Sequence, residues 1–421
     1  MKPLHLILFL FSISLHSQTW QSTSIANNAN NQRFDDVFFL NETTGWAANG
    51  YYAAVYKTID GGITWTEQLN ESDLGGSYYF RNIEFLNDTI GFLGTLNGEF
   101  FKTTDGGQNW TEVSLSPNPQ AICGLDTVGS STIYGCGAYF TPAHIIKSTD
   151  SGTTWNVMDM SAYATALVEV LFHNEMLGYA SGRNNTGGCI LKTTDGGQTW
   201  TEIYNTNIPG EYVWKLQILD DSNIIFGSVS SVASNPGKLV KSLDNGNNWL
   251  SYDAPETDVQ AVGFINANTG WMGGHNTGFH QTNDGGVTWN NINVGGNLNR
   301  IFVINENLAY AAGTTIYKFT EETLNTDNHA FQDSQKLNIK LNKNPVISHL
   351  NLTIEFSDDD NVLIELYDTN GQYIKQLSRD TNILAGTTRN YKFDVQSLSS
   401  GMYFVDIHNN FQRQSLKFIK Q

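Results

Sequence analysis

The chain has 421 residues, of which only 15% are charged and 12% are aromatic, and glycine occurs 39 times. No long segment repeats apolar residues at the 3.6-residue period of a helix, so the composition favours an extracellular all-β protein. The formal net charge of −18 argues against nucleic acid or an anionic membrane surface as a partner.

The N-terminus is typical of a secretory signal peptide over residues 1–17. Lys2 supplies the positive start, and an apolar run of about twelve residues follows from Leu4 to Leu15. This run is too short to span a bilayer, and no later segment is long and apolar enough to do so. We therefore expect cleavage after Ser17, export, and a mature protein without a transmembrane segment.

A nine-residue pattern then occurs six times: a basic or polar residue, Ser or Thr, any residue, Asp, a small residue, Gly, two variable positions and Trp. Its aspartates are Asp60, Asp105, Asp150, Asp195, Asp244 and Asp284, which are spaced 45, 45, 45, 49 and 40 residues apart. A period near 45 with a Gly-rich turn predicts one propeller blade per repeat.

A hairpin pattern precedes each of these turns, for example residues 37–39 followed by 45–47. There are seven such hairpins but only six Asp turns, because the seventh hairpin ends near Lys318 and the chain then leaves the pattern. Residues 18–21 resemble residues 198–201, which follow a turn elsewhere. We therefore predict a seven-bladed propeller over residues 18–320, in which the N-terminal strand completes the last blade.

The repeated aspartates are interpreted as structural residues. An Asp at the start of a tight turn accepts backbone N–H bonds two or three residues on, and Gly tolerates positive φ. The Trp is expected to pack between neighbouring sheets. One carboxylate per turn falls far short of the six to eight oxygens that calcium takes, so we expect no metal and no cofactor.

These nonapeptides resemble the Asp-box, or bacterial neuraminidase repeat, of sialidases, some xyloglucan-degrading enzymes, sortilins and photosystem II assembly factors. The combined pattern, with residues 37–39, 45–47 and 57–65 as its first copy, most resembles the photosystem II assembly and stability factor family. In that family the propeller is a non-enzymatic assembly scaffold. The resemblance bears on fold more than on function, because the matching positions are the structural ones.

Three cysteines give little framework for disulfides. Cys123 and Cys136 flank a predicted turn at residues 128–131, and a hairpin there would set them opposite one another. A cross-strand disulfide and two small buried apolar side chains are both compatible with this spacing. Cys189 has no partner in either case, and no Cys/His spacing resembles a zinc site.

The sequence changes character after Phe319, with a polar linker over residues 321–336 and a second β domain over 337–421. Its short strands and the hairpin turn at residues 368–371 predict a small Ig-like β-sandwich. The ordered landmarks are residues 344–346, 366–371, 398–404 and 417–421. They resemble the type A C-terminal sorting domain of the type IX secretion system, although Lys343 departs from the usual pattern.

The sorting-domain resemblance implies passage through the outer membrane, with the tail read by the secretion machinery and then removed. The protein is then either secreted or displayed on the cell surface. An ordinary adhesive sandwich domain is the alternative interpretation of the tail.

The face where the innermost strands begin is the expected ligand site of a propeller. Aligning the seven inner strands places a mixed ring of charges and one aromatic around the channel rim: Arg33, Asp36, Arg81, Glu169, Trp214, Lys215 and Arg300. Such charges are expected to be solvated. The other interpretation is a polar binding surface, with Trp214, Tyr79 or Tyr212 stacking on a sugar or peptide.

An enzyme of the sialidase kind would hold its substrate with three arginines, usually announced by Arg-Ile-Pro, which does not occur here. Seven blades also differ from the six of sialidases, and xyloglucan-cleaving relatives use two propellers. Asp36 and Glu169 could form a carboxylate pair for glycoside hydrolysis. We therefore favour a non-enzymatic binding or scaffold propeller with an extracellular protein or glycan as ligand, and a sialidase- or xyloglucanase-type glycoside hydrolase is the alternative.

Overall fold

The computed structural model describes residues 19–25, 32–137, 142–219, 222–232, 235–320, 338–341, 343–356, 360–368, 373–408 and 413–421. The predicted signal peptide (1–17) and linker (321–336) lie outside these residues. The chain divides into two compact units, Met1–Asp327 and Asn328–Gln421. Within the described residues, no helix is long and apolar enough to cross a membrane.

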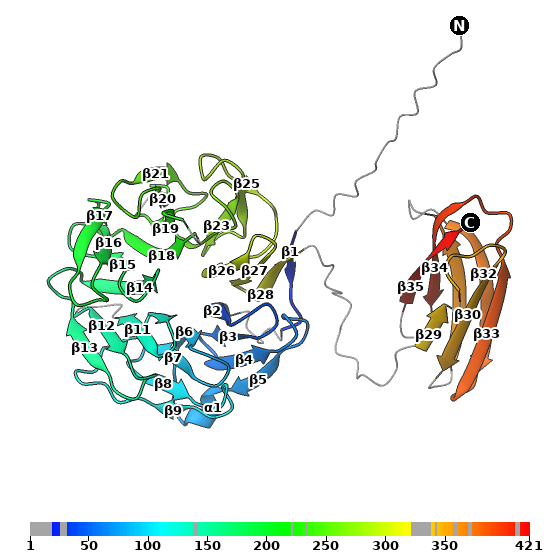
Figure 1. Ribbon diagram of the computed structural model, residues 1–421, viewed down its shortest axis with the longest axis horizontal. Helices are drawn as coiled ribbons and strands as arrows, with labels where there is room; N and C mark the ends of the chain where they lie inside the picture. The colour runs from blue at the N-terminus through cyan, green and yellow to red at the C-terminus, as the bar shows by residue number, and fades with distance from the viewer. Residues whose placement is uncertain are drawn as a thin grey trace, which may run out of the picture. The chain divides into compact units, whose positions relative to one another are not determined.

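The first unit is a seven-bladed β-propeller, as predicted, in which each blade is a four-stranded antiparallel sheet (Figure 1). The innermost strands are β2 (Phe34–Phe39), β6 (Phe80–Phe85), β10 (Gly124–Val128), β14 (Ala166–Phe172), β18 (Tyr212–Ile218), β22 (Val259–Phe264) and β26 (Arg300–Asn305). The second strands are β3 (Gly45–Asn49), β7 (Gly91–Thr95), β11 (Thr132–Gly137), β15 (Gly178–Arg183), β19 (Ile225–Ser230), β23 (Gly270–Gly274) and β27 (Leu308–Ala312).

The outer half of each blade carries the repeated turn. The third strands are β4 (Ala54–Thr58), β8 (Phe100–Thr103), β12 (His144–Ser148), β16 (Gly188–Thr193), β20 (Lys238–Ser242), β24 (His280–Thr282) and β28 (Ile316–Thr320). The outermost strands are β5 (Thr66–Leu69), β9 (Thr111–Glu112), β13 (Asn156–Asp159), β17 (Thr201–Asn205), β21 (Leu250–Asp253), β25 (Asn290–Asn291) and β1 (Thr19–Ser22), and a short helix, α1 (Glu71–Leu74), follows β5.

The predicted closure of the ring by the N-terminal strand is confirmed. Strand β1 pairs antiparallel with β28, with Trp20 opposite Phe319, so the last blade has the order β1-β28-β27-β26. Trp20 is 3% exposed, and its ring stacks on Phe279 of the preceding blade at 4.2 Å. The first and last strands of the propeller thus share one sheet, and no open edge is left between them.

The repeated Asp closes its own turn, as the fourth copy illustrates. Thr193 Oγ1 donates to Asp195 Oδ1 at 2.8 Å and accepts the Gly197 N–H at 2.9 Å. Asp195 also accepts the backbone N–H of Thr199 at 2.9 Å and its hydroxyl at 2.6 Å. These hydrogen bonds, led by that of the Thr199 hydroxyl, lower the pKa of Asp195 to about 2. Gly196 and Gly197 have φ of 71° and 82°, which glycine adopts without strain.

The first position of the repeat has a role that the sequence analysis did not assign. In five blades its lysine reaches across to the next blade and donates from Nζ to a backbone carbonyl there. The pairs are Lys57 with Gly106, Lys102 with Ser151, Lys147 with Gly196, Lys192 with Asn245 and Lys241 with Ala267, at 2.7 to 3.1 Å. Each ammonium also lies 4.8 to 6.0 Å from an aromatic ring centroid. These contacts tie neighbouring blades together.

The hairpin predicted around the first two cysteines is present, but the disulfide is not. Strands β10 and β11 pair with Gly124 opposite Cys136, and Cys123 donates its backbone N–H to Cys136. Cys123, Cys136 and Cys189 are all free and buried. Burial raises the pKa of the Cys123 thiol to about 11 and that of Cys189 to about 12.

The second unit is a sandwich of two antiparallel sheets. One sheet contains β29 (Asn338–Leu341), β30 (His349–Phe356) and β33 (Thr387–Asp394), and the other contains β32 (Tyr373–Ile383), β31 (Asp360–Tyr367), β34 (Gly401–His408) and β35 (Arg413–Lys420). Both contribute to one core, with Leu352 from the first sheet and Ile364 and Ile407 from the second. Asn344 Oδ1 accepts the backbone N–H of Ile419 at 2.9 Å, which joins the Asn-Pro-Val landmark to the last strand.

Candidate functional site

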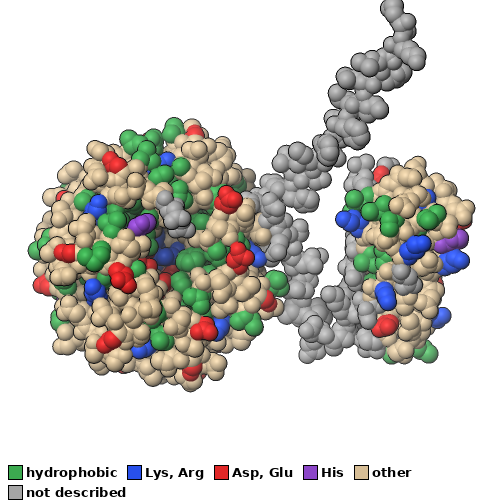
Figure 2. Space-filling model, in the orientation of Figure 1, with side chains coloured by type: hydrophobic (Ala, Val, Ile, Leu, Met, Phe, Trp, Pro, Cys, Tyr) green, Lys and Arg blue, Asp and Glu red, His purple; other side chains and the backbone are tan. Residues whose placement is uncertain are grey.

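The innermost strands surround the axis of the propeller, and Figure 2 shows a hollow at its centre with Lys and Arg side chains inside. Neighbouring inner strands are hydrogen bonded to one another at equivalent or adjacent positions. Asp36 Oδ2 accepts the Ile83 N–H at 3.0 Å, and Gln217 Oε1 accepts the Phe264 N–H at 2.7 Å. The strands therefore share one direction along the axis, and we call the ends where they begin and finish the channel entrance and the channel exit.

Four of the seven predicted rim residues form one group, the central ion network, made of Asp36, Glu169, Lys215 and Arg300. Arg300 Nη1 lies 2.8 Å from Glu169 Oε1, and its Nε lies 3.3 Å from Asp36 Oδ1. Lys215 Nζ binds the other oxygen of Glu169 at 2.6 Å. Residues from four blades, widely separated in sequence, thus meet through two cations and two carboxylates.

The expectation that these charges are solvated is wrong. The side chains of Asp36, Glu169 and Lys215 are 2%, 1% and 4% exposed. Burial raises the pKa of Asp36 against the attraction of Arg300, and it lowers the pKa of Lys215 against that of Glu169. Burial lowers the pKa of Arg300, but the combined attraction of Glu169, Asp36 and Glu84 outweighs it, so the pKa of Arg300 is raised.

Two further predicted residues, Arg33 and Arg81, meet at the channel entrance through Asp35, which the sequence analysis did not identify. Asp35 Oδ1 lies 3.0 Å from Arg33 Nη2 and 2.7 Å from Arg81 Nη1, and its side chain is fully buried. Strict strand alternation places Asp35 and Asp36 on opposite faces. A β-bulge between Phe34 and Asp36 breaks that alternation, so both carboxylates take part in ion pairs.

Trp214, the aromatic member of the predicted rim, is 8% exposed and is held on several sides. Its ring stacks on Tyr212 at 4.7 Å, Arg81 lies 5.8 Å from its centroid, and its Nε1 donates to Ser230 Oγ at 2.6 Å. The stacking faces predicted for Trp214 and Tyr212 are therefore largely covered. Tyr79 is half-buried, and burial raises its pKa to about 12.

More accessible groups surround this cluster. Tyr51 is 60% exposed and lies edge-on to Tyr52 at 5.7 Å, in the turn that follows β3 at the channel entrance. His275 is exposed, and Arg33 Nη1 donates to Asn297 Oδ1 at 3.3 Å. Although much of the side chain is exposed, partial desolvation of the ring and the neighbouring Arg33 lower the pKa of His275. We call Arg33, Tyr51, Tyr79, His275 and Asn297 the entrance rim.

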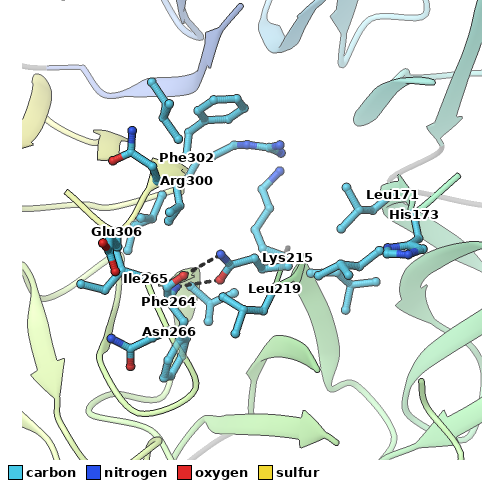
Figure 3. A pocket seen from close by; sticks show the side chains of 18 of the residues that line it. Leu171, His173, Lys215, Leu219, Phe264, Ile265, Asn266, Arg300, Phe302 and Glu306 are labelled. Carbon is cyan, nitrogen blue, oxygen red and sulfur yellow. Dashed lines mark hydrogen bonds between the residues drawn. The ribbon is translucent and has the colours of Figure 1, made fainter. Parts of the chain in front are cut away.

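A pocket of about 580 Å³, the exit pocket, lies at the other end of the channel (Figure 3). Residues at the ends of β14, β18, β22 and β26 line it, and the side-chain ends of Lys215 and Arg300 lie close together in it. Nothing in the sequence analysis pointed to this pocket. Among the described residues, no group of three or more His, Cys, Asp or Glu side chains could hold a metal ion.

Two family models match separate parts of the chain. That of the photosynthesis system II assembly factor YCF48 matches residues 13–158, and that of the secretion system C-terminal sorting domain matches residues 344–421. The sorting domain indicates export by type IX secretion, to the cell surface or the medium. No curated protein matches the sequence.

Solved structures with the same fold include two of YCF48 and one glycoside hydrolase. YCF48 bound to D1 peptide has a TM-score of 0.55 and 19% identity, over 72% of this chain and 96% of that one. YCF48 from Cyanidioschyzon merolae has a TM-score of 0.57 and 19% identity, over 72% and 99%. The Niastella koreensis GH74 enzyme has a TM-score of 0.54 and 13% identity, over 94% and 74%. At these identities the likeness establishes the fold alone.

Proposed function

We propose that this chain, which combines a YCF48-like propeller with a secretion sorting domain, is an exported non-enzymatic binding protein whose ligand is an extracellular polypeptide or glycan. Binding takes place at the entrance rim. The two-domain division at residues 18–320 and 337–421 assigns ligand binding to the propeller and export to the tail. A YCF48 structure has been solved with a peptide bound, which provides a precedent for a polypeptide ligand on this fold.

The observation that carries the proposal is the state of the channel carboxylates. A glycoside hydrolase needs one carboxyl group as acid and a second as base or nucleophile, both open to the substrate. Asp36 and Glu169 are instead buried, and both are bound to Arg300. Their charges serve the ion network, and neither carboxylate is open to a sugar.

The entrance rim supplies what a binding surface needs. Tyr51 offers an open aromatic face, and Arg33, His275 and Asn297 offer hydrogen-bonding groups on neighbouring loops. Arg33 is already positioned, because Asp35 and Gln260 hold its guanidinium at 3.0 and 2.9 Å. A ligand that binds here would therefore meet a side chain that has little freedom left to lose.

A glycan array, a peptide array and a panel of glycosidase substrates, applied to the full exported chain, test the proposal. We expect a saturable ligand without turnover, and at least a tenfold loss of affinity in Tyr51→Ala, about the value of one exposed aromatic contact. Met176→Ala is the matched control, because Met176 is 54% exposed and lies beyond the end of β14 at the channel exit.

The hydrolase alternative has a distinct signature. Turnover of a glycoside substrate that is lost in Asp36→Asn or Glu169→Gln, without a change in folding, would contradict the proposal. A ligand whose affinity is unchanged in Tyr51→Ala and Arg33→Ala would remove the entrance rim as its binding surface.

A further inference from the structure

The exit pocket has an apolar wall. Leu171, Leu219, Ile265, Phe302 and Ile304 line it, and all five are only half-buried, although they come from four different blades. Each of them packs against the core of a blade and still leaves apolar surface in the pocket, and a ligand that covers this surface removes it from water. The wall therefore suits a ligand with an apolar body.

The floor of the exit pocket consists of hydrogen-bond donors. Lys215 and Arg300 line the pocket, whereas their carboxylate partners Asp36 and Glu169 do not. Lys215 uses one of its three N–H bonds on Glu169, and Arg300 donates one of its five to Glu169 and forms an ion pair with Asp36. Donors that are not engaged by Asp36 or Glu169 therefore face the pocket, and they call for an oxygen acceptor on the ligand.

A sugar does not suit this combination. Sugar hydroxyls need acceptors as well as donors. Next to the floor, the Gln217 amide is engaged by Phe264, with Nε2 donating to the carbonyl at 2.9 Å and Oε1 accepting the N–H at 2.7 Å. The other polar side chains of the lining stand at or beyond the ends of their strands: His173, Asn266, Asn305 and Glu306. The walls are mainly aliphatic, with few aromatic faces for a sugar ring to stack on. A carboxylate suits the floor better, since its bonds to ammonium and guanidinium groups are charge-assisted.

The charge balance of the floor also admits an anion. The two cations of the central ion network are matched by Asp36 and Glu169, so the network as a whole is neutral when all four groups are ionised. Of the four residues of the central ion network, only Lys215 and Arg300 line the pocket, so a ligand on its floor meets these cations before Asp36 and Glu169. The carboxylate that does line the pocket, Glu306, is exposed and lies beyond the end of β26. At about 580 Å³ the exit pocket has the size of an ordinary small-molecule site.

We infer that the exit pocket binds a medium-chain fatty acid as its carboxylate, with the head group on Lys215 and Arg300 and the alkyl chain along the apolar wall. This site is separate from the entrance rim and its ligand. A chain of methylenes has no polar groups to satisfy, so each one that enters the wall contributes hydrophobic free energy alone.

Calorimetric titration of the full chain with octanoate, decanoate and dodecanoate tests the inference. Each added methylene should tighten Kd about threefold to fourfold, the equivalent of roughly 0.8 kcal/mol. Decanol and methyl decanoate should bind at least about tenfold more weakly than decanoate, because they lose the charge-assisted bonds.

Variants of the wall locate the binding. Ile265→Glu and Ile304→Glu should each weaken decanoate binding at least about tenfold, since they place a like charge and a polar group on the path of the chain. Leu86→Glu is the control. Leu86 follows the inner strand of its blade as Ile265 does, with its N–H bonded to the Ile90 carbonyl as that of Ile265 is to Thr269, but it does not line the pocket.

Three results would overturn the inference. The first is that none of the three acids binds, and the second is that decanol and decanoate bind with equal affinity. The third is an unchanged affinity for decanoate in Ile265→Glu or Ile304→Glu, measured on a variant that keeps the melting temperature of the original chain. Binding of a peptide with a free apolar C-terminus, when no fatty acid binds, would assign the exit pocket to a polypeptide instead.

Discussion

Replacing Arg300 with methionine should destabilise the propeller by about 3–5 kcal/mol, the usual cost of removing one partner of a buried ion pair. The two carboxylates that it leaves behind, Asp36 and Glu169, have side chains only 2% and 1% exposed. Glu169 keeps Lys215 at 2.6 Å, so Asp36 loses more. For roughly 300 residues, an unfolding entropy of about 0.6 kcal/mol/K converts this cost into a drop of about 5–8 °C in Tm.

A double-mutant cycle separates the charge effect from the loss of packing. Asp36→Asn keeps an oxygen that can accept the Asn82 Nδ2–H and Ile83 N–H bonds, which are 2.7 and 3.0 Å long in this structure. With the carboxylate gone, Arg300→Met should cost less, and the coupling between the two changes should be about 1–3 kcal/mol.

Intrinsic tryptophan fluorescence is the suitable assay, because all ten tryptophans lie between Trp20 and Trp289 and thus report on the propeller alone. Urea and thermal unfolding of the full chain give the midpoints, with unchanged m-values as the condition for comparing them. Lys238→Met is the control, since Lys238 pairs with the well-exposed Asp253 and should scarcely change Tm. A Tm drop of less than about 2 °C for Arg300→Met, or zero coupling in the cycle, would refute the reasoning.

Three further predictions concern the repeat and the channel. Lys102→Met removes the 2.7 Å bond to the Ser151 carbonyl of the next blade and should cost about 1–2 kcal/mol in urea unfolding, whereas an unchanged midpoint would deny the inter-blade role. Burial raises the pKa of Asp126, which accepts the Phe172 N–H, to about 7. Stability should therefore fall as pH rises from about 4 to 7, and urea midpoints across that range should show a smaller fall in Asp126→Asn. The fall should not vanish, because burial also raises the pKa values of Asp36 and Glu84. The pKa of Asp195 is lowered to about 2, so its contribution to folding stability is present above about pH 4 and should be lost between pH 4 and 2. Near-ultraviolet circular dichroism over that interval should show that Asp195→Asn is less sensitive to acid than the original chain.

The architecture could be predicted because the repeat encodes it at several independent positions. The Asp turns gave the number of complete blades, and the likeness of residues 18–21 to residues 198–201 identified the strand that completes the ring. The role of the repeat lysines could not be read in the same way. Lys102 contacts a carbonyl 49 residues away, and that contact exists only once the blades stand side by side.

The candidate site was harder to predict, for two physical reasons. The sequence does not show the β-bulge at the start of β2, so the alignment of the inner strands placed Asp36 on the rim and missed Asp35. Nor does it show how far the inner strands stand from the axis. Charges placed on a rim by alignment were expected in solvent, but side chains from opposite blades reach one another across the axis, as Arg300 and Glu169 do at 2.8 Å.

Arg300 connects these conclusions, because it belongs to the central ion network and also lines the exit pocket. Arg300→Met should therefore lower stability and weaken decanoate binding together, whereas a ligand of the entrance rim, which is held by Arg33 and Tyr51, should keep its affinity. A catalytic role for Asp36 and Glu169 predicts another pattern, in which turnover at the channel entrance is lost with either carboxylate. Three measurements on Arg300→Met therefore distinguish two arrangements of the channel: its stability, its affinity for decanoate and its affinity for the rim ligand. One arrangement is a structural ion network with a ligand at each end, and the other is a single catalytic centre.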